Sequence, residues 1–263
     1  MARGRRYAWL VGSSISPSRL PQFLEPGGHT AYGSAVDYRL GKVEAHGPID
    51  GDWLDCGCAE GYYCEALSQR GAKSVVGVDV IAERVAGAEA LSHPSNVTFQ
   101  VAGAGSLPFD DCSFDGVLVN EVLEHVEDEA ASLQDIRRVL RPGGRLVLFS
   151  PNRWFPFEGH GARLPSNRDL LTVPVPLMPW LPARLTSRFA TARNYWPGQL
   201  RSVIADNGFE IISTEFSLCQ FDRYRWMPKP MIDSFRRNIP RIEQSPLRRF
   251  VAVSTFVLGR RAA

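Results

Sequence analysis

Short apolar runs alternate with amphipathic helical patterns between residues 52 and 152. Runs of strand length, bounded by turn residues, predict buried strands at 52–56, 73–80, 96–102, 114–120 and 144–152, the last one after the turn "RPGG". Helical patterns at 60–71, 81–92 and 131–140 lie between most of them. Because this alternation is typical of parallel strands joined by right-handed crossovers, it predicts a doubly wound α/β sheet. Ligands of such sheets bind at the carboxyl ends of the strands.

The flanking segments complete the predicted organisation. Apolar runs at 209–216 and 250–261 predict two late strands, whereas the proline-rich segment 151–205 is too irregular for core strands and predicts a lid. We therefore expect an α/β domain with N-terminal and inserted lid segments. Its parts are an N-terminal helical cap that folds over the site (1–45), a ligand-binding core (46–152), a lid or substrate insertion (153–205) and the final strands with a basic loop (206–263).

Composition and cysteine content indicate an ordinary soluble protein. The chain is 44% hydrophobic and 22% charged with a net charge of +2, which gives no global reason to expect nucleic-acid binding. Five cysteines without an export signal favour a reduced, cytoplasmic protein. The most apolar stretch, "LLTVPVPLMPWLP", is too short to span a bilayer and is broken by four prolines. It is a candidate hydrophobic lid.

Positive charge gathers locally in residues 217–249, which hold eight Lys or Arg against three Asp or Glu, a balance of +5. Two interpretations stay open. A charged segment of this kind is most often a solvated face. The alternative is attraction of an anionic substrate such as a phosphate, a carboxylate or an acidic lipid surface.

The stretch "WLDCGCAEGYYCEAL" has the features of a nucleotide loop. Asp55 lies at the tip of the first predicted strand, and Gly57, Ala59 and Gly61 follow in a tight turn before a helix. Small residues let the backbone approach a ligand, and the amides at the start of the helix face it. The spacing differs from the G-x-G-x-x-G fingerprint, which disfavours a hydride-transfer enzyme. The second strand ends at Asp79, whose carboxylate suits both hydroxyls of a ribose.

Together with "SLPFDDCSFDGVLVNEVLEHV" and "RVLRPGGRLVLFSPN", these features resemble the class I S-adenosylmethionine-dependent methyltransferases over about residues 50–152. The resemblance implies a Rossmann-like, seven-stranded sheet with a reversed final hairpin, and S-adenosylmethionine as the cofactor. In it, Asp79 would bind the ribose hydroxyls and Asn120 would line the floor of the site. The implied cofactor-binding residues are Asp55, Gly57, Cys58, Gly61, Asp79, Ala104 and Asn120.

The sequence departs from the family's pattern at two positions. Ala59 replaces a usual glycine, a change that the loop should tolerate, and Gly103 replaces an aspartate that often holds the adenine amino group. We therefore expect adenine to be held by the backbone at Ala104 and by apolar contacts. Cys56 and Cys58 fall within the strand-to-loop motif, so a zinc site is not expected there.

The segment "NEVLEHVED" gathers Glu121, Glu124 and His125 at the end of the fourth predicted strand. A helix capped by Asn120 would place all three on one face, because i, i+3 and i+4 are neighbours on a helix. Two carboxylates and an imidazole suit Mg or Mn better than Zn. The pattern is similar to the metal site of quinone-biosynthesis O-methyltransferases and of small-RNA terminal 2′-O-methyltransferases, and His160 is the candidate fourth ligand. The alternatives are a metal-free general base, His125 or His160, and a purely structural role.

These observations predict methyl transfer from S-adenosylmethionine to a hydroxyl of a small molecule, with a sugar or sugar-acid derivative as the first choice because the tail is basic. A phenolic or polyketide acceptor is the alternative, favoured by aromatic residues of the lid that can stack on a ring. An RNA 2′-O-methyltransferase and a cofactor-binding protein without catalysis are further alternatives. The sequence shows no RNA-binding module, and oligomeric state is not predicted.

Overall fold

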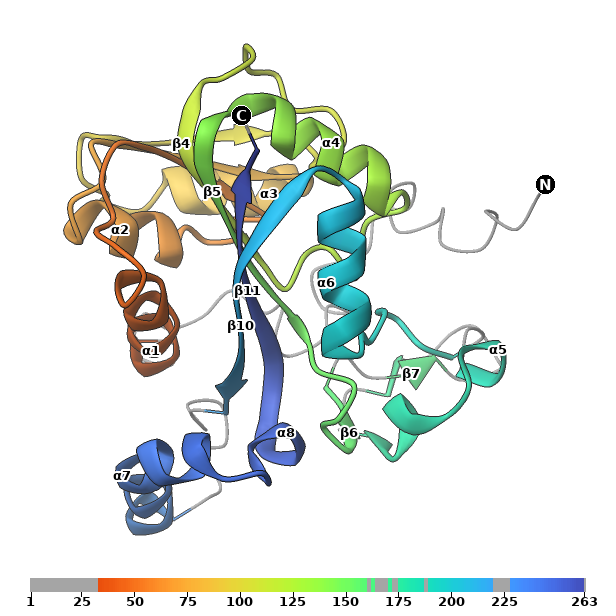
Figure 1. The fold of residues 1–263 in the computed structure, drawn as a ribbon. Coiled ribbons are helices and arrows are strands. Elements are labelled where there is room, and N and C mark those ends of the chain that lie inside the picture. Colours follow the sequence, from red (N-terminus) through yellow and green to blue (C-terminus); the bar gives the residue numbers. More distant parts are fainter. Residues whose placement is uncertain are drawn as a thin grey trace.

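We analysed a computed structural model that describes residues 33–159, 162–163, 170–171, 175–186, 189–219 and 228–262. A seven-stranded sheet runs through the described part (Figure 1). Its strands are β1 (Asp52–Cys56), β2 (Ser74–Asp79), β3 (Val97–Val101), β4 (Phe114–Asn120), β5 (Leu140–Pro151), β10 (Phe209–Leu218) and β11 (Ala252–Arg261). The strands follow the predicted apolar runs closely. In a sheet that is covered by helices, a strand must bury its side chains, so strands form where the sequence is apolar.

The strand order is β10-β11-β5-β4-β1-β2-β3. Strands β1 to β5 pair in parallel, and β11 lies between β5 and β10, antiparallel to both. The predicted doubly wound sheet with its reversed final hairpin is therefore confirmed. The chain winds from β1 towards β3 on one side and from β4 towards the hairpin on the other, so the topological switch point lies between β1 and β4.

Helices cover both faces of the sheet (Figure 1). They are α1 (Gly33–Glu44), α2 (Tyr62–Gln69), α3 (Ala82–Glu89), α4 (Glu129–Val139) and α6 (Pro197–Asp206). One hydrophobic cluster joins α1 and α2 to the sheet through Leu40 and Leu67 around Trp53. The other joins α4 and α6 to the opposite face through Leu133 and Ile204. Each buried leucine of this kind contributes roughly 1.5–3 kcal/mol through the hydrophobic effect, so both layers are firmly attached.

The start of β5 differs from the sequence prediction. The turn at 141–144 is not a connection before the strand, because β5 already begins at Leu140, which pairs with Phe114. The register then jumps to a pair between Gly116 and Arg145, so these residues form a bulge. Gly143 has φ 78°, a backbone conformation that glycine adopts without a steric cost. The strand can therefore bulge and rejoin the ladder.

Short elements connect β5 to α6, where the sequence predicts a lid. They are β6 (Phe157–Glu158), β7 (Ala162–Arg163), β8 (Leu170–Leu171), β9 (Val175–Pro176), η3 (Met178–Trp180) and α5 (Ala183–Thr186). β6 pairs with β9, and β7 pairs with β8. Residues 195–204, at the end of this segment, contribute Tyr195, Leu200 and Ile204 to the core cluster. The division of the chain into cap, core and lid stays a prediction.

The basic segment before β11 contains α7 (Lys229–Gln244) and α8 (Arg248–Val251), while residues 220–227 lie outside the described part. Glu243 near the end of α7 accepts hydrogen bonds from Tyr38 at 2.6 Å and from Lys42 at 2.7 Å. These bonds fasten α7 to α1. Of the cap predicted for residues 1–45, the described part is α1 and its flanks. No described helix is long and apolar enough to cross a membrane.

Candidate active site

The polar residues predicted from the sequence meet at the carboxyl ends of β1, β2 and β4, on either side of the switch point. Asp55 precedes the last residue of β1, Asp79 ends β2, and Asn120 ends β4. Parallel strands bring their carboxyl ends to one edge of the sheet. In open α/β sheets, ligands bind in the crevice outside these strand ends, at the switch point. This edge is therefore the candidate active site.

The loop between β1 and α2 is built from three left-handed residues. Gly57, Ala59 and Gly61 have φ values of 88°, 47° and 82°. A Cβ on Gly57 would lie 2.2 Å from Cγ2 of Val122, so this position admits only glycine for steric reasons as well as for its φ. Ala59 takes a conformation that costs an L-residue about 1–2 kcal/mol. The loop therefore accommodates Ala59 in the predicted turn, with the conformational cost of a left-handed residue.

Two backbone contacts hold this loop against β2. The amides of Gly57 and Cys58 both donate to the carbonyl oxygen of Val78, at 2.7 and 2.9 Å. The amide of Gly61, which precedes α2, donates to the carbonyl oxygen of Cys58 at 2.8 Å. Since the amides of Gly57, Cys58 and Gly61 are hydrogen-bonded within the fold, the loop holds its conformation before any ligand binds.

Asp79 is buried and held in one orientation. Its Oδ2 accepts from the amide of Ala59 at 3.1 Å, its Oδ1 accepts from the amide of Ile81 at 2.9 Å, and Nη1 of Arg84 lies 3.7 Å from Oδ2. A carboxylate offers about four acceptor sites, so these contacts leave capacity for a ligand's hydroxyl groups. The carboxylate thus connects the loop after β1 to the end of β2, a second role that the sequence did not indicate.

Asp55 is 1% exposed. Burial raises the pKa of its carboxyl group to about 7; the charge of Asp79 adds to the shift, and a hydrogen bond from Cys64 opposes it. That bond runs from Sγ of Cys64 to Oδ2 of Asp55 at 3.3 Å. A carboxyl group that ionises near neutral pH in the free protein is stabilised as a carboxylate by a cationic ligand group, such as an ammonium.

The segment after β4 is not a helix, so the prediction of a helix capped by Asn120 is wrong. Glu121 has φ 56°, and its amide still bonds the carbonyl oxygen of Phe149 at 2.9 Å. A turn follows, in which the amide of His125 donates to the carbonyl oxygen of Val122 at 2.9 Å. The left-handed residue redirects the chain away from the sheet edge before a helix can start.

The next helix, α4, begins only at Glu129. Its N-cap is Asp128, whose carboxylate accepts from the amide of Ala131 at 2.9 Å. Capping at Asp128 satisfies one of the free amides of the first turn. The spacing i, i+3, i+4 therefore does not place Glu121, Glu124 and His125 on one helical face.

Glu121 is engaged by an arginine from the cap. Nη2 of Arg39, on α1, donates to Oε1 of Glu121 at 2.8 Å, and the hydroxyl of Ser254 donates to the same oxygen. Arg39 also donates to Oδ1 of Asn120 and, at 2.8 Å, to Oγ of Ser254. One partly buried arginine thus joins α1, the end of β4 and the start of β11. No sequence motif indicated Arg39 or Ser254, because their partners are about 80 and 130 positions away along the chain.

Glu124 lies deeper, at 2% exposure. The hydroxyl of Ser150, near the end of β5, donates to its Oε2 at 3.0 Å. Burial, followed by the charge of Glu121, raises the pKa of Glu124 well above its ordinary value. This carboxyl group therefore favours its neutral form, which is a poor metal ligand.

The described residues do not fit the predicted metal site. Among them there is no group of three or more His, Cys, Asp or Glu side chains that could hold a metal ion. Glu121 is bound to Arg39, Glu124 favours its neutral form, and His125 does not join them in such a group. His160 lies outside the described residues. We therefore derive no reaction step through a metal.

A second arginine that the sequence did not indicate supports the turn after β4. Nη1 of Arg193 donates to the carbonyl oxygen of Val126 at 2.6 Å, and its amide donates to the carbonyl oxygen of Glu124 at 3.2 Å. Its Nε lies 3.4 Å from Oε1 of Glu129. Residues from the proline-rich segment thus hold the turn that carries the candidate catalytic groups.

The backbone around Gly103 and Ala104, where the sequence departs from the family's pattern, is closely packed. Ala104 is buried beside Gly103, and a Cβ on Gly103 would lie 3.2 Å from Cγ1 of Val80. A larger side chain at position 103 would press on that valine, so the small residue fits its surroundings. The assignment of the adenine contact to the backbone of Ala104 stays a prediction.

The fold is similar to the Rossmann-like fold of solved S-adenosylmethionine-dependent methyltransferases. An S-adenosylmethionine dependent methyltransferase from Mesorhizobium loti superimposes with a TM-score of 0.57 at 19% identity, covering 89% of this chain and 99% of that chain. A putative methyltransferase of Haloferax volcanii, solved with the activator Trm112, gives a TM-score of 0.59 at 19% identity, over 88% and 92% of the two chains. At such identities the likeness concerns the fold alone.

Sequence similarity identifies the central part of the chain more closely. Residues 54–148 match the model of a family described as methyltransferase domain. An O-methyltransferase of Aspergillus sclerotiorum is 37% identical over 99 residues, which are 36% of this chain and 38% of that protein. A ubiquinone biosynthesis O-methyltransferase of Idiomarina loihiensis is 36% identical over 120 residues, 44% and 49% of the two chains. The chain thus spans less than half the length of these relatives, and residues 54–148 are similar to a methyltransferase domain.

Proposed function

We propose that the protein transfers a methyl group from S-adenosylmethionine to a hydroxyl oxygen of a small molecule. One observation carries the proposal: Asp55, the glycine loop and Asp79 meet at the switch point of the sheet, inside the segment that matches the methyltransferase domain. The names of the similar O-methyltransferases support oxygen as the acceptor atom.

In this proposal the cofactor lies across the carboxyl ends of β1 and β2. Asp79 binds the ribose hydroxyls, the backbone at Gly57, Cys58 and Gly61 allows close approach, and Asp55 lies near the methionine end. Asn120 lines the floor of the site. The buried positions of Asp55 and Asp79 support their proposed roles, because charged hydrogen bonds are stronger where water is excluded.

Methyl transfer from a sulfonium is an in-line displacement that depends mainly on alignment. The acceptor oxygen forms a bond to the methyl carbon as the carbon–sulfur bond breaks, and the hydroxyl proton must leave. We assign the base to His125, which follows β4 in the turn held by Arg193, with His160 as the alternative. Neutral imidazole can take the proton near pH 7, whereas Glu124 favours its protonated form.

The finer predictions from the sequence stay proposals. A sugar acceptor and assistance by Mg or Mn have no support among the described residues beyond the pattern of the sequence itself. A phenolic or polyketide acceptor has more support, because aromatic side chains gather after β5, where Trp154 and Trp196 lie with ring centroids 4.8 Å apart. RNA 2′-O-methylation and binding without catalysis are the rival functions.

The test is a methyl-transfer assay over a panel of hydroxylated acceptors, with and without a chelator. We expect transfer that persists in chelator and that falls by a factor of about 10²–10⁴ in His125→Ala, as expected for loss of a general base. His46→Ala is the matched control, because His46 pairs with Glu215 away from the site. Activity that is lost in chelator and restored by Mg or Mn would favour the metal-assisted mechanism instead. Cofactor binding without methylation of any acceptor would contradict the proposed catalysis.

A further inference from the structure

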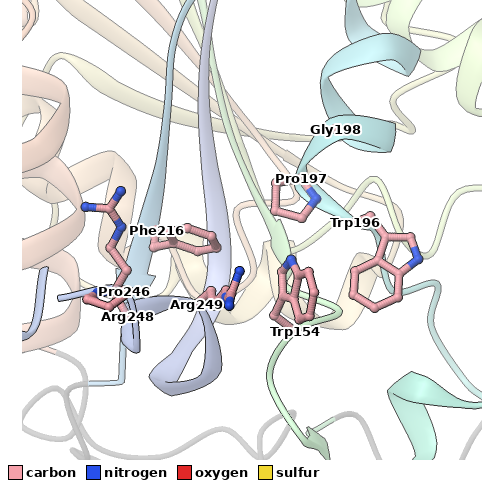
Figure 2. Close-up of a pocket in the computed structure, with 8 residues that line it drawn as sticks. All are labelled: Trp154, Trp196, Pro197, Gly198, Phe216, Pro246, Arg248 and Arg249. Carbon is pink, nitrogen blue, oxygen red and sulfur yellow. The ribbon is translucent and has the colours of Figure 1, made fainter.

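A pocket opens where the chain leaves β5, between residues of β10, α8 and the start of α6 (Figure 2). It has a volume of about 530 Å³. Aromatic rings of Trp154, Trp196 and Phe216 form its walls, and Arg248 and Arg249 supply its charge. Figure 2 shows the guanidinium group of Arg249 between Phe216 and Trp154. We call it the aromatic–arginine pocket; among the residues that the structure describes, no Asp or Glu lines it.

The arginines of this pocket are placed to bind an anion. The guanidinium carbon of Arg249 lies 4.9 Å from the ring centroid of Trp154, and that of Arg248 lies 6.0 Å from the ring of Phe216. An arginine stacked on a ring can still use its N–H edge for two parallel bonds to a carboxylate or phosphate. Nη1 of Arg248 also donates to the carbonyl oxygen of Glu243 at 2.6 Å, so Arg249 is the arginine placed for such a pair of bonds. Within the described part of the chain, neither arginine forms an ion pair with an Asp or Glu. Their charge is therefore not neutralised by those residues.

A buried asparagine fixes the pocket's two sides relative to each other. Asn152 is 1% exposed, and its Nδ2 donates to the carbonyl oxygens of Arg249 at 2.7 Å and Ala252 at 2.9 Å. Its Oδ1 accepts from the amide of Trp154 at 3.1 Å. The backbone that carries the arginine and the backbone that carries the tryptophan are thus joined through one side chain. This preorganisation reduces the entropic cost of binding.

The pocket lies close to the proposed transfer site along the sheet edge. Ser254, which bonds Glu121 at the end of β4, pairs with Pro151 at the end of β5. Trp154 follows three positions later in the chain. Neighbouring strands are about 4.8 Å apart, so two strand spacings from β4 cover only about 10 Å. An acceptor of two or three rings could reach from one site to the other.

We propose that the aromatic–arginine pocket binds an aromatic acid and anchors the methyl acceptor by its carboxylate or phosphate group. The flat walls suit a ring and the two arginines suit an anion. A neutral sugar would meet neither requirement. The role as an acceptor anchor rests on the proposed methyl transfer, whereas binding of an aromatic acid does not.

Direct binding tests the pocket without any reaction. Phenyl phosphate is titrated into the full chain and followed by tryptophan fluorescence and calorimetry, with inorganic phosphate and benzyl alcohol as probes that lack the ring or the charge. We expect saturable binding of phenyl phosphate that is at least about tenfold weaker in Arg249→Gln, through loss of a charge-assisted bond, and weaker in Trp154→Leu. Benzyl alcohol, which lacks the charge, and inorganic phosphate, which lacks the ring, should both bind more weakly than phenyl phosphate.

Arg241→Gln is the matched control, because Arg241 is exposed on α7 and lies outside the pocket; its phenyl phosphate affinity should equal that of the wild type. Equal weakening in Arg241→Gln and Arg249→Gln would show only a general charge effect and would overturn the proposal. Absent binding, or equal binding of inorganic phosphate, would also overturn it.

A kinetic experiment separates this proposal from the proposed function. Pairs of phenolic acceptors with and without a ring carboxylate are compared in wild type and Arg249→Gln. We expect the variant to raise KM about tenfold for the carboxylated member while leaving kcat and the neutral member unchanged. If methyl transfer occurs and the KM for the carboxylated acceptor is equal in wild type and Arg249→Gln, the anchor role is overturned and the proposed methyl transfer stands. Binding of phenyl phosphate without methyl transfer to any acceptor would overturn the proposed function and the anchor role together, but not the binding site.

Discussion

Single side chains at the switch point are the places where burial and charge conflict most strongly. Asp55 and Glu124 are carboxyl groups within the core, and burial raises the pKa of both. Native stability is lost when such a group must ionise inside the protein. The protein tolerates that cost at the edge where the cofactor is proposed to bind, which is the usual pattern of a functional site.

The pH dependence of stability tests the environment of Asp55. Its pKa is about 7 in the folded protein and about 3.9 in an unfolded chain, so the folded state retains the proton in between. Stability contributed by this group is therefore present at low pH and is lost as pH rises towards 7, with a slope of up to about 1.4 kcal/mol per pH unit. Urea denaturation from pH 5 to 8 should show a smaller slope in Asp55→Asn than in the wild type. Identical slopes would mean that Asp55 is more solvated than the structure indicates.

Asp79 is predicted to contribute to cofactor affinity through its ribose contacts. Asp79→Ala should weaken S-adenosylmethionine binding by about 1–3 kcal/mol, because charge-assisted hydrogen bonds are lost. Isothermal titration calorimetry measures the effect, and the exposed Asp111→Ala serves as the control. Since Asp79 also holds the loop, urea denaturation of the variant must accompany the titration. Unchanged affinity would contradict the ribose role.

At the scale of elements, α1 depends on a partly buried ionic contact at the sheet edge. Nη2 of Arg39 lies 2.8 Å from Oε1 of Glu121, and the two side chains are 13% and 23% exposed. Removing one partner leaves the other charge without its hydrogen-bond partner in a region of limited water access. The segment that brings α1 over the site is thus coupled to the turn after β4 and to the start of β11.

We expect Arg39→Met to lower the free energy of unfolding by about 1–3 kcal/mol, because the partly buried carboxylate of Glu121 loses its charged hydrogen-bond donor. Combining it with Glu121→Leu should recover part of that loss, because the carboxylate no longer lacks a partner. Chemical denaturation of the two single variants and the double variant gives the coupling free energy. For comparison, Asp37→Ala removes a partner of Arg70 that is 69% exposed and should cost less than about 1 kcal/mol. Additive effects of the Arg39 and Glu121 substitutions would contradict the coupling.

For the whole molecule, a ligand that binds only the folded state raises stability by mass action. S-adenosylhomocysteine at 100 times its Kd should add about 2.7 kcal/mol to the free energy of unfolding. Denaturant titrations with and without the ligand measure this, and NAD is the matched control because the loop lacks the dinucleotide spacing. Stabilisation by NAD without stabilisation by S-adenosylhomocysteine would indicate a dinucleotide-binding protein.

The fold itself does not fix the reaction. The cyclase SpnF superimposes with a TM-score of 0.58 at 20% identity, so the same architecture also serves a protein named for another activity. What distinguishes functions on one fold is the set of side chains at the strand ends and the pockets beside them. In the functions that we propose, these are the Asp55–Asp79 edge and the aromatic–arginine pocket.

The sequence by itself determined the sheet, the glycine loop and the two carboxylates, because apolar periodicity and local turn residues are properties of neighbouring positions. It failed after β4. There Glu121 and His125 have helical spacing, but the ladder bond to Phe149 and the left-handed residue prevent a helix. Arg39, Ser150 and Arg193 were equally hidden, since their contacts join distant segments.

Only the tertiary structure decided the conformation and the contacts of "NEVLEHVED". It separated a predicted metal set into a carboxylate bound to Arg39, a buried carboxyl group that favours its proton, and a histidine in a turn. The aromatic–arginine pocket was also decided there, because β5, β10 and α8 meet only in the folded sheet. Residue spacing fixes local conformation, whereas the ionisation and partners of a side chain depend on which distant groups exclude water from it.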